Sequence, residues 1–259
     1  PDRRTGGLDQ VYPEGGFRSI MEHLRLLCDS PDSIYRNVAV LPHLDHADPE
    51  YDQWALTEGS RFLASVMFDA QRYAPEKNAS LTRDYVRNYG KNLLIEGIME
   101  QLNVADKHAK MDSASSDHYL ELAEEYVKKT GIDFLVADLG TEQQSASSGG
   151  VHYLQERARN LTAILGRKML VLHGTSSLDQ NQMQGLAEDG VIRVNMWTKI
   201  AREAGKYAAG NLFKRAESLF SNDFEATESN QYLMDSIEKA SDLMMTILEI
   251  LNYQNLTKK

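Results

Sequence analysis

The residues best suited to chemistry lie in one short stretch, where two histidines and a carboxylate follow an apolar run. Residues 38–41 are apolar, His43, Asp45 and His46 follow at once, and Pro49 ends regular structure. Such a run between breakers predicts a buried strand, and α/β proteins gather their reactive side chains where strands end. Imidazole and carboxylate groups there can bind a metal ion, move a proton, or do both. The simpler alternative is a polar strand end at which His43 makes a structural hydrogen bond.

Five further apolar runs also end in polar residues, and helical patterns separate them. The six predicted strands cover 38–41, 65–69, 93–96, 134–140, 169–174 and 191–195, with ends at His43/Asp45/His46, Asp69, Glu96, Gly140 with Thr141, His173 and Asn195. The predicted helices cover 16–28, 51–59, 75–89, 116–129, 153–165, 179–188, the region from 198, and about 230–253. Strands alternating with helices predict a parallel sheet with right-handed crossovers. Because a barrel collects strand ends at one mouth, we favour an α/β (β/α)8 TIM barrel of which six units are visible.

The composition limits the function classes. At 259 residues, 42% of them hydrophobic, the chain can form one barrel domain, and its formal charge of −10 disfavours nucleic acid and acidic membranes as partners. No strand is followed by a nucleotide-binding glycine motif. Cys28 is the single cysteine, which we interpret as a small buried hydrophobe, so no disulfide framework exists. With no long apolar run and no secretory signal, we expect a cytoplasmic protein.

Four segments, in this order and spacing, resemble the class II (metal-dependent) fructose-bisphosphate and tagatose-bisphosphate aldolase family. They are His43-Leu44-Asp45-His46, Ser65-Val66-Met67-Phe68-Asp69, Leu172-His173-Gly174, and Asp189-Gly190-Val191 running into Arg193-Val194-Asn195. Family members begin with a further strand–helix–strand unit that is missing here. We therefore expect either a truncated or incompletely observed chain, which we favour, or a barrel that closes differently. In both cases we expect a single domain over residues 1–259, with a helical extension from about residue 198.

The resemblance implies a zinc site, with another divalent metal as an alternative, and a role for each matching residue. The metal would polarise a ketose carbonyl and stabilise the enediolate that remains after carbon–carbon cleavage. The implied roles are proton transfer for Asp45; metal binding for His46, His173, and Glu142 or Gln143; a second shell or second metal for Asp69 and Glu96; and substrate or phosphate binding for Gly174, Thr175, Ser176, Asn195 and Thr198.

Three departures from the family pattern fall on the expected active mouth. Gln143 occupies the position of the middle histidine ligand, and glutamine is a poor zinc ligand, so Glu142 or His152 would have to replace it. A Gly-Gly-Ser-Gly phosphate loop becomes residues 174–177, Gly-Thr-Ser-Ser, and an Asn-x-Asp-Thr motif becomes residues 195–198, Asn-Met-Trp-Thr. We therefore expect a substrate other than simple fructose 1,6-bisphosphate.

Two classes of function remain open from the sequence. The first is a divalent-metal-dependent aldol cleavage or condensation of a ketose or ketose phosphate, with a sugar phosphate epimerase as a close variant. The second is a non-catalytic aldolase-like subunit that partners an active enzyme. In either case we expect a small sugar or sugar phosphate as ligand, and a homodimer in which the apolar terminal helix packs on its own domain or on a partner.

Overall fold

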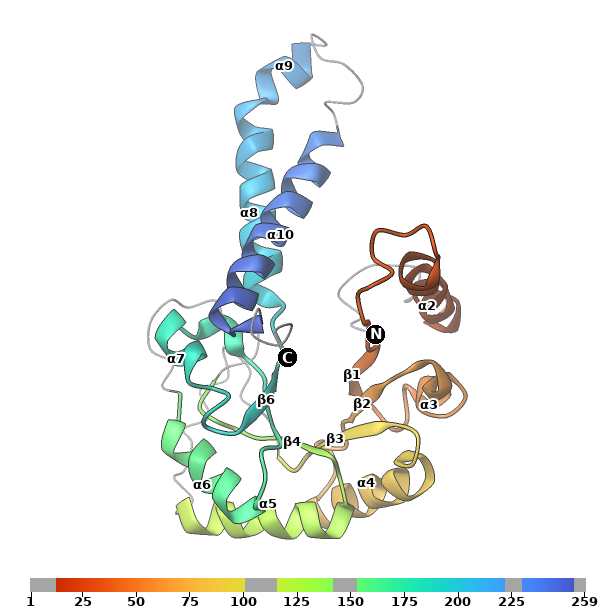
Figure 1. Ribbon diagram of the computed structural model, residues 1–259, viewed down its shortest axis with the longest axis vertical. Helices are drawn as coiled ribbons and strands as arrows, with labels where there is room; N and C mark the ends of the chain where they lie inside the picture. Colours follow the sequence, from red (N-terminus) through yellow and green to blue (C-terminus); the bar gives the residue numbers. More distant parts are fainter. Residues whose placement is uncertain (1–12, 101–115, 142–152, 222–229, 254–259) are drawn as a thin grey trace. The chain divides into compact units, whose positions relative to one another are not determined.

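The computed structural model describes residues 13–100, 116–141, 153–221 and 230–253 (Figure 1). The chain divides into two compact units. The first unit comprises Pro1–Gln101 and Glu125–Leu135, and the second comprises Leu102–Glu124 and Val136–Lys259. Helix α5 (Ser116–Thr130) and strand β4 (Phe134–Val136) contribute residues to both units.

The first unit is a parallel sheet with helices along its strands. Strands β1 (His43–Ala47), β2 (Ser65–Phe68) and β3 (Leu94–Ile98) pair in parallel, and β4 follows β3 in the strand order. The β2–β3 register is regular, with Val66 opposite Ile95 and Met67 opposite Glu96. The helices are α2 (Pro13–Asp29), α3 (Gln53–Leu56), the 3-10 turn η1 (Gly59–Phe62) and α4 (Pro75–Tyr89).

The core of the first unit explains why its strands read as apolar runs. All four residues of β2 are buried, as are Ile95 and Ile98 of β3. A strand covered on both faces has no polar face, so it shows no period-two alternation. Helix α4 covers this sheet with Tyr85, whose ring stacks on Phe68 at a centroid distance of 4.6 Å. The sheet therefore holds the ends of β1 and β2 in a fixed relation.

The predicted strand over residues 38–41 is wrong. The structure places no strand there, and β1 begins instead at His43, inside the polar stretch. Val38 and Leu41 are 53% and 72% exposed. Hydrogen bonding to a neighbouring strand, and not the apolar run, decides where β1 forms, because its register with β2 starts at His43 opposite Ser65.

The second unit repeats the strand–helix alternation. Its strand order is β4, β5 (Leu170–Leu172), β6 (Val191–Val194), with β5 and β6 parallel. Its helices are α6 (Gln155–Leu165), the 3-10 turn η2 (Thr175–Ser177), α7 (Gln180–Gln184), α8 (Thr198–Lys214), α9 (Ala216–Ser221) and α10 (Gln231–Ile250).

A buried carboxylate fixes the turn into β6. Asp189 is fully buried and accepts hydrogen bonds from Arg159 Nε at 2.7 Å, Gln155 Nε2 at 3.0 Å and Tyr153 Oη at 3.1 Å. Gly190 follows at φ +102°, and a Cβ there would lie 1.8 Å from Thr162 Oγ1. The Asp-Gly pair is therefore dictated by the entry into the strand, independently of chemistry.

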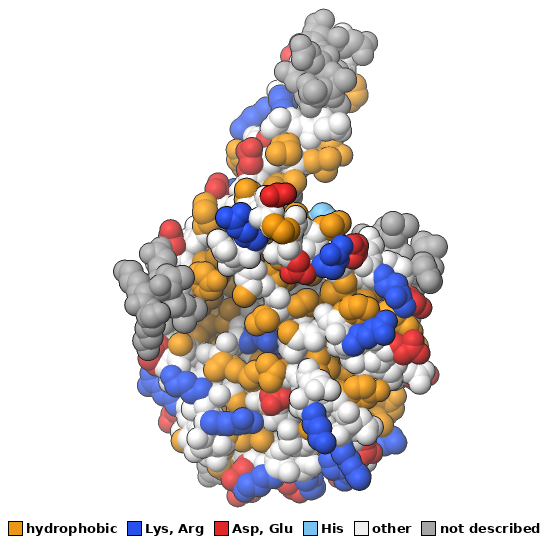
Figure 2. Space-filling view, turned by 45° about the vertical axis from the view of Figure 1, so that its right-hand side comes forward, with side chains coloured by type: hydrophobic (Ala, Val, Ile, Leu, Met, Phe, Trp, Pro, Cys, Tyr) orange, Lys and Arg blue, Asp and Glu red, His pale blue; other side chains and the backbone are white. Residues whose placement is uncertain are grey.

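Helices α8 and α10 lie side by side in the second unit (Figure 1). Arg215, which caps α8, pairs with Asp235 of α10 at 2.8 Å. The outer faces of the two helices and α9 are unusually apolar, and hydrophobic side chains lie among charged ones along them (Figure 2). The exposed residues are Tyr207, Leu212, Phe213, Phe220, Leu233, Met234, Ile237, Met244 and Met245.

The parallel sheet with its helices confirms the predicted α/β class, and helices α8, α9 and α10 follow from residue 198 on. The described residues form a sheet of six strands, so a complete, closed (β/α)8 barrel stays a prediction. The single domain over residues 1–259 also stays a prediction. None of the described helices combines the length and the apolar character needed to cross a bilayer.

Candidate functional site

The backbone of β1 is distorted at its reactive residues. Its register with β2 shifts between Leu44, opposite Val66, and Ala47, opposite Phe68, so β1 has one residue more than β2. His46 lies at φ +49°, in the left-handed region that non-glycine residues seldom adopt. This β-bulge re-aims a side chain, which is what bulges beside functional sites do. The sequence predicts that Asp45 and His46 share a face only if the strand has turned into a loop; the bulge provides that turn within the strand.

His46 is held by the carboxylate that follows β2. Its Nδ1 atom lies 2.7 Å from Asp69 Oδ2. The same carboxylate oxygen accepts a hydrogen bond from the side-chain amide of Gln71 at 2.8 Å, and Asp69 Oδ1 accepts one from the Gln71 backbone N–H at 3.2 Å. An imidazole that donates Nδ1–H to a carboxylate carries its lone pair on Nε2, which is the usual arrangement of a metal-binding histidine.

The charges around this pair reinforce each other. Burial lowers the pKa of His46, but the hydrogen bond to Asp69 and the negative charges of Asp45, Asp69 and Glu96 outweigh it, so the pKa of His46 is raised. Burial likewise raises the pKa of Asp69, but the bonds from His46 and Gln71 outweigh it, so the pKa of Asp69 is lowered. An acidic environment of this kind also attracts a metal cation.

His43 makes the structural hydrogen bond that the sequence leaves open as the simpler alternative. Its Nδ1 lies 2.9 Å from Ser65 Oγ, and its Nε2 lies 3.8 Å from both Asp45 Oδ1 and Glu96 Oε2. Glu96 is fully buried in the middle of β3, although the sequence predicts it at a strand end. His43 thus lies between the predicted proton-transfer residue and a buried acid, and its ring is held by the side-chain hydroxyl of Ser65 on β2.

The loops that carry these residues are tied together. Arg72 Nε bonds Asp48 Oδ2 at 3.1 Å, which joins the segment after β2 to the segment after β1. The guanidinium also lies over the rings of Tyr51 and Tyr73, at 5.0 and 4.8 Å from their centroids. These contacts hold the Asp69–Tyr73 segment in place, and with it the partners of His46.

In the second unit, His173 follows β5 and is buried, with 5% of its surface exposed. Its Nε2 lies 3.1 Å from Asn195 Nδ2, and its backbone carbonyl accepts a hydrogen bond from Thr141 Oγ1 at 2.6 Å. Asn195 follows β6, and its backbone N–H donates to Leu172 O at 3.0 Å. The structure therefore brings together two predicted site residues: His173, predicted as a metal ligand, and Asn195, predicted to contact the substrate.

The predicted phosphate loop is hydrogen bonded within the second unit. Gly174 keeps the left-handed conformation, at φ +69°, that begins the turn η2. Thr175 Oγ1 donates to Asn195 O at 2.6 Å, and Ser176 Oγ accepts from the Lys199 backbone N–H at 3.0 Å. Thr198 is the first residue of α8, directly beside this contact.

Three predicted metal ligands lie outside the described residues, and the contact between Gln71 and Asp69 is not predicted by the sequence analysis. Glu142, Gln143 and His152 lie outside the described residues. Gln71 was not singled out, although a residue two positions after an aspartate commonly donates its backbone N–H to that carboxylate. An aspartate at a strand end, such as Asp69, therefore predicts a backbone hydrogen bond from the residue two positions later.

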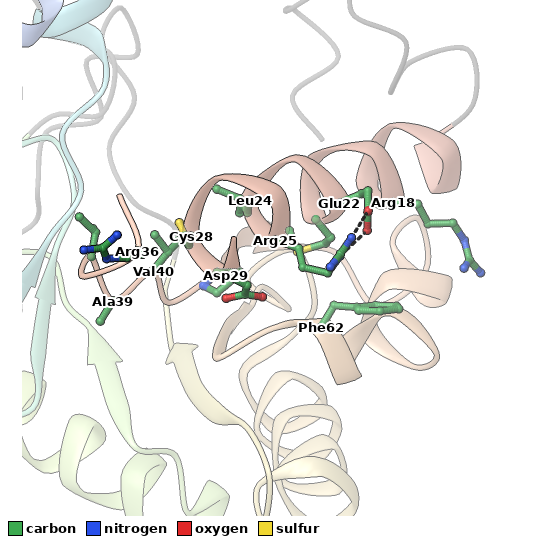
Figure 3. Close-up of a pocket in the computed structure, with 13 residues that line it drawn as sticks. Arg18, Glu22, Leu24, Arg25, Cys28, Asp29, Arg36, Ala39, Val40 and Phe62 are labelled. Carbon is green, nitrogen blue, oxygen red and sulfur yellow. Dashed lines mark hydrogen bonds and ion pairs between the residues drawn. The ribbon is translucent and has the colours of Figure 1, made fainter. Parts of the chain in front are cut away.

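A groove of about 670 Å³ in the first unit lies elsewhere (Figure 3). Helix α2 and residues 36–42 line it, with Arg25 paired to Glu22 at 2.7 Å along its wall. Cys28 lines the groove and is partly exposed, which corrects the prediction of a buried hydrophobe. Neither His46 nor Asp69 contributes to the lining, so the groove is separate from the candidate site.

Strand-end histidines and acids on a parallel α/β scaffold define a class of protein that binds small molecules or metals at the carboxyl ends of its strands. Comparison with known proteins narrows this class. The model of the family described as fructose-bisphosphate aldolase class-II matches residues 8–256. The chain therefore belongs to the class II fructose-bisphosphate aldolase family.

Individual relatives are distant. The chain is 26% identical over 206 residues to the fructose-bisphosphate aldolase of Streptococcus pneumoniae, covering 79% of this chain and 65% of that protein. It is 25% identical over 227 residues to the 6-phospho-5-dehydro-2-deoxy-D-gluconate aldolase of Shouchella clausii, covering 87% and 74% respectively. The solved fructose-bisphosphate aldolase of Campylobacter jejuni has a TM-score of 0.70 at 18% identity, covering 92% and 76%. The chain thus spans just under two thirds of the length of the pneumococcal relative.

The donor chemistry of the first unit fits the divalent metal that the family implies. An imidazole held at Nδ1 by a carboxylate, with further acids around it, matches the ligand types and outer partners that zinc prefers. In the second unit, His173 supplies another imidazole whose ring is fixed by a neighbouring amide.

Proposed function

We propose that this protein catalyses aldol cleavage or condensation of a ketose phosphate with a divalent metal, most simply zinc. The observation that carries the proposal is the hydrogen bond between His46, on the bulged strand β1, and Asp69, which follows β2, within a chain of the class II aldolase family. His46 and His173 would hold the metal, and Glu142 or Gln143 would complete the ligand set. When bound, the metal would supply Lewis-acid polarisation of the ketose carbonyl.

The residues of the chain would divide the remaining work. Asp45, half exposed at the bulge, would take the proton of the β-hydroxyl group as the carbon–carbon bond breaks, and return it in the condensation direction. Asp69 would keep His46 in the tautomer that presents Nε2. The buried Glu96 would keep the surroundings negative, while Gly174, Thr175, Ser176, Asn195 and Thr198 would contact the substrate or its phosphate.

The names of the relatives support a phosphorylated substrate without choosing one. The relatives include a fructose-bisphosphate aldolase and an aldolase that acts on a phosphorylated sugar acid. In this chain Thr175 stands in place of a glycine of the family loop, and its hydroxyl already donates to Asn195 O within the unit. We infer that the phosphate subsite is narrower than in a loop with glycine at this position, which favours a substrate other than simple fructose 1,6-bisphosphate.

The proposal is tested by elemental analysis and turnover on the same samples. The wild-type chain should retain a stoichiometric divalent metal after dialysis and should cleave at least one ketose phosphate. His46→Ala and His173→Ala should each lose both properties. Full metal occupancy in both variants would show that the site lies elsewhere.

The second candidate function is a non-catalytic subunit of an aldolase complex. The hydroxyl of Thr175, which donates to Asn195 O inside the second unit, favours it, because that proton is then not available to a phosphate. Turnover should then be absent in the isolated chain, and an active aldolase should co-purify with it. Turnover by the isolated chain would exclude this candidate.

We propose a homodimer built on the helices α8 and α10. The charged residues beside their exposed apolar side chains are opposite in sign: α8 carries Lys199, Arg202, Lys206 and Lys214 against Glu203, whereas α10 carries Glu238, Asp242 and Glu249 against Lys239. Pairing α8 of one copy with α10 of another would join opposite charges around an apolar centre. Sedimentation should show a dimer that Phe213→Glu dissociates and Leu122→Glu, a control on α5, does not.

A further inference from the structure

The side chain of Gln71 is placed to act on His46 through Asp69. Its amide Nε2 donates to Asp69 Oδ2 at 2.8 Å, the same oxygen that lies 2.7 Å from His46 Nδ1. Its backbone N–H takes the other oxygen, Oδ1, at 3.2 Å. Gln71 therefore donates a hydrogen bond to each oxygen of the Asp69 carboxylate. These two bonds fix the orientation of the carboxylate relative to the imidazole of His46.

The chemistry of a carboxylate explains why this grip matters. An aspartate can rotate about its Cβ–Cγ bond and can present either oxygen, so one hydrogen bond to an imidazole does not fix the plane of the group. Three donors on two oxygens fix that plane. They also favour the ionised carboxylate, which accepts from His46 Nδ1–H and cannot donate to a bare Nδ1.

The backbone of His46 makes an external clamp necessary. At φ +49° in a β-bulge, the residue lies in a strained conformation that persists only where the surroundings over-determine it. The Asp69–Tyr73 segment supplies the opposing contacts, and Arg72 anchors that segment to Asp48. Gln71 is the member of the segment whose side chain reaches the Asp69–His46 pair.

We propose that Gln71 is a positioning residue that fixes the Nδ1–H tautomer of His46 through Asp69 and thereby sets the affinity for the metal. The inference rests on the proposed function for the role of His46 as a ligand. It adds a residue outside the family motifs, and it assigns the Gln71 side chain to metal affinity instead of substrate contact.

The test compares Gln71→Met with Gln53→Met. Methionine has nearly the length of glutamine and cannot donate, and Gln53 is an exposed glutamine of the same unit, on α3. Binding of Zn²⁺ alone is measured by competition with a chromophoric chelator. Gln71→Met should bind about ten-fold more weakly than wild type, the lower end of the range for loss of an outer partner, and Gln53→Met should bind equally.

A second readout separates positioning from general loosening. In metal-free protein with ¹⁵N-labelled histidine, at a pH where imidazoles are neutral, the ring nitrogen shifts of His46 report its tautomer. Wild type and Gln53→Met should show the Nδ1–H form, and Gln71→Met a mixture with the Nε2–H form. Should Gln71→Met fold poorly, Gln71→Glu replaces it, because it keeps the length and polarity but sets a carboxylate against Asp69.

The outcomes distinguish the inference from the function beneath it. Wild-type affinity and an unmixed tautomer in Gln71→Met, together with lost binding in His46→Ala, would overturn the inference and leave the metal site standing. Undiminished binding in His46→Ala would overturn both. Weaker binding with a mixed tautomer in Gln71→Met alone would establish the positioning role.

Discussion

The two units hold their candidate ligands in opposite ways. In the first unit a charged carboxylate grips Nδ1 of a partly exposed histidine on a strained backbone. In the second unit the neutral amide of Asn195 contacts Nε2 of the buried His173, and the backbone of His173 itself is not in the left-handed region. One imidazole is held by a charged partner at a partly exposed position, and the other by a neutral partner at a buried position.

This difference predicts which ring nitrogen of each histidine would bind the metal. The carboxylate at His46 Nδ1 leaves the lone pair on Nε2, so a metal is expected at Nε2. Asn195 occupies the Nε2 side of His173, and rotation of its amide lets it either donate to Nε2 or accept from Nε2–H. A ligand role for His173 therefore favours its Nδ1, with the Asn195 oxygen accepting the proton of Nε2.

The largest expected effect is loss of either imidazole. His46→Ala and His173→Ala should each weaken Zn²⁺ binding by more than about 100-fold, beyond the roughly 10–100-fold that loss of an outer partner costs. Their stabilities should differ. His173→Ala opens a cavity in buried surroundings and should lower the free energy of unfolding by about 2 kcal/mol, whereas His46→Ala should lower it by less than about 1 kcal/mol.

Competition with a chelator and urea denaturation measure these two quantities. Equal destabilisation by both substitutions would contradict the contrast between a partly exposed histidine with a charged partner and a buried histidine with a neutral one.

The next effect is loss of the charge at the partner of His46. Asp69→Asn keeps the shape but removes the negative charge, and the amide can donate to Nδ1 as readily as accept from it. Zn²⁺ affinity should fall by about 10–100-fold. Isothermal titration of the metal-free variant measures this, and Asp84→Asn on the exposed face of α4 is the matched control, with no expected change. Unaltered affinity in Asp69→Asn would mean that orientation of His46 does not depend on charge.

The elements of both units were largely predictable, and their causes are local. The helix predicted at 75–89 matches α4 residue for residue, because Pro75 favours its first turn and Gly90 caps its end. The prediction of 116–129 differs from α5 by one residue, since Gly131, at φ +72°, ends it. Both signals lie within the segment itself.

The errors concern long-range pairing. The apolar run at 38–41 looks like a strand, but the pairing that begins at His43 opposite Ser65 decides where β1 starts. The bulge at His46 has only a weak compositional signal, because histidine adopts positive φ more often than most residues but still does so rarely. The choice of Asp45 and His46 as site residues came from residue type and order, whereas the partners Ser65 and Gln71 come from the fold.

A smaller effect belongs to the partner of His173. Asn195→Ala removes a neutral hydrogen bond worth about 1 kcal/mol, so Zn²⁺ affinity should fall by about five-fold. The matched control is Asn92→Ala, in the turn after α4, which should bind as wild type does. Tighter binding in Asn195→Ala would mean that the amide competes with the metal for Nε2, which would reverse the assignment of His173 Nδ1 as the ligand atom.

The smallest effect tests the strain on which the contrast is based. Glycine adopts positive φ freely, while a Cβ costs about 1–2 kcal/mol in the left-handed region, offset by the greater entropy that glycine loses on folding. His46→Gly should therefore be more stable than His46→Ala by about 0.5–1 kcal/mol. At His173, whose backbone is not left-handed, the order should reverse, because only the entropy cost remains. Urea midpoints of the four variants give both differences, and because each pair lacks the imidazole, bound metal does not enter the comparison. If alanine is more stabilising than glycine at both positions, the backbone at residue 46 must leave the left-handed region once the imidazole is removed. The hydrogen bond of His46 to Asp69, which Gln71 also holds, would then be the cause of its positive φ.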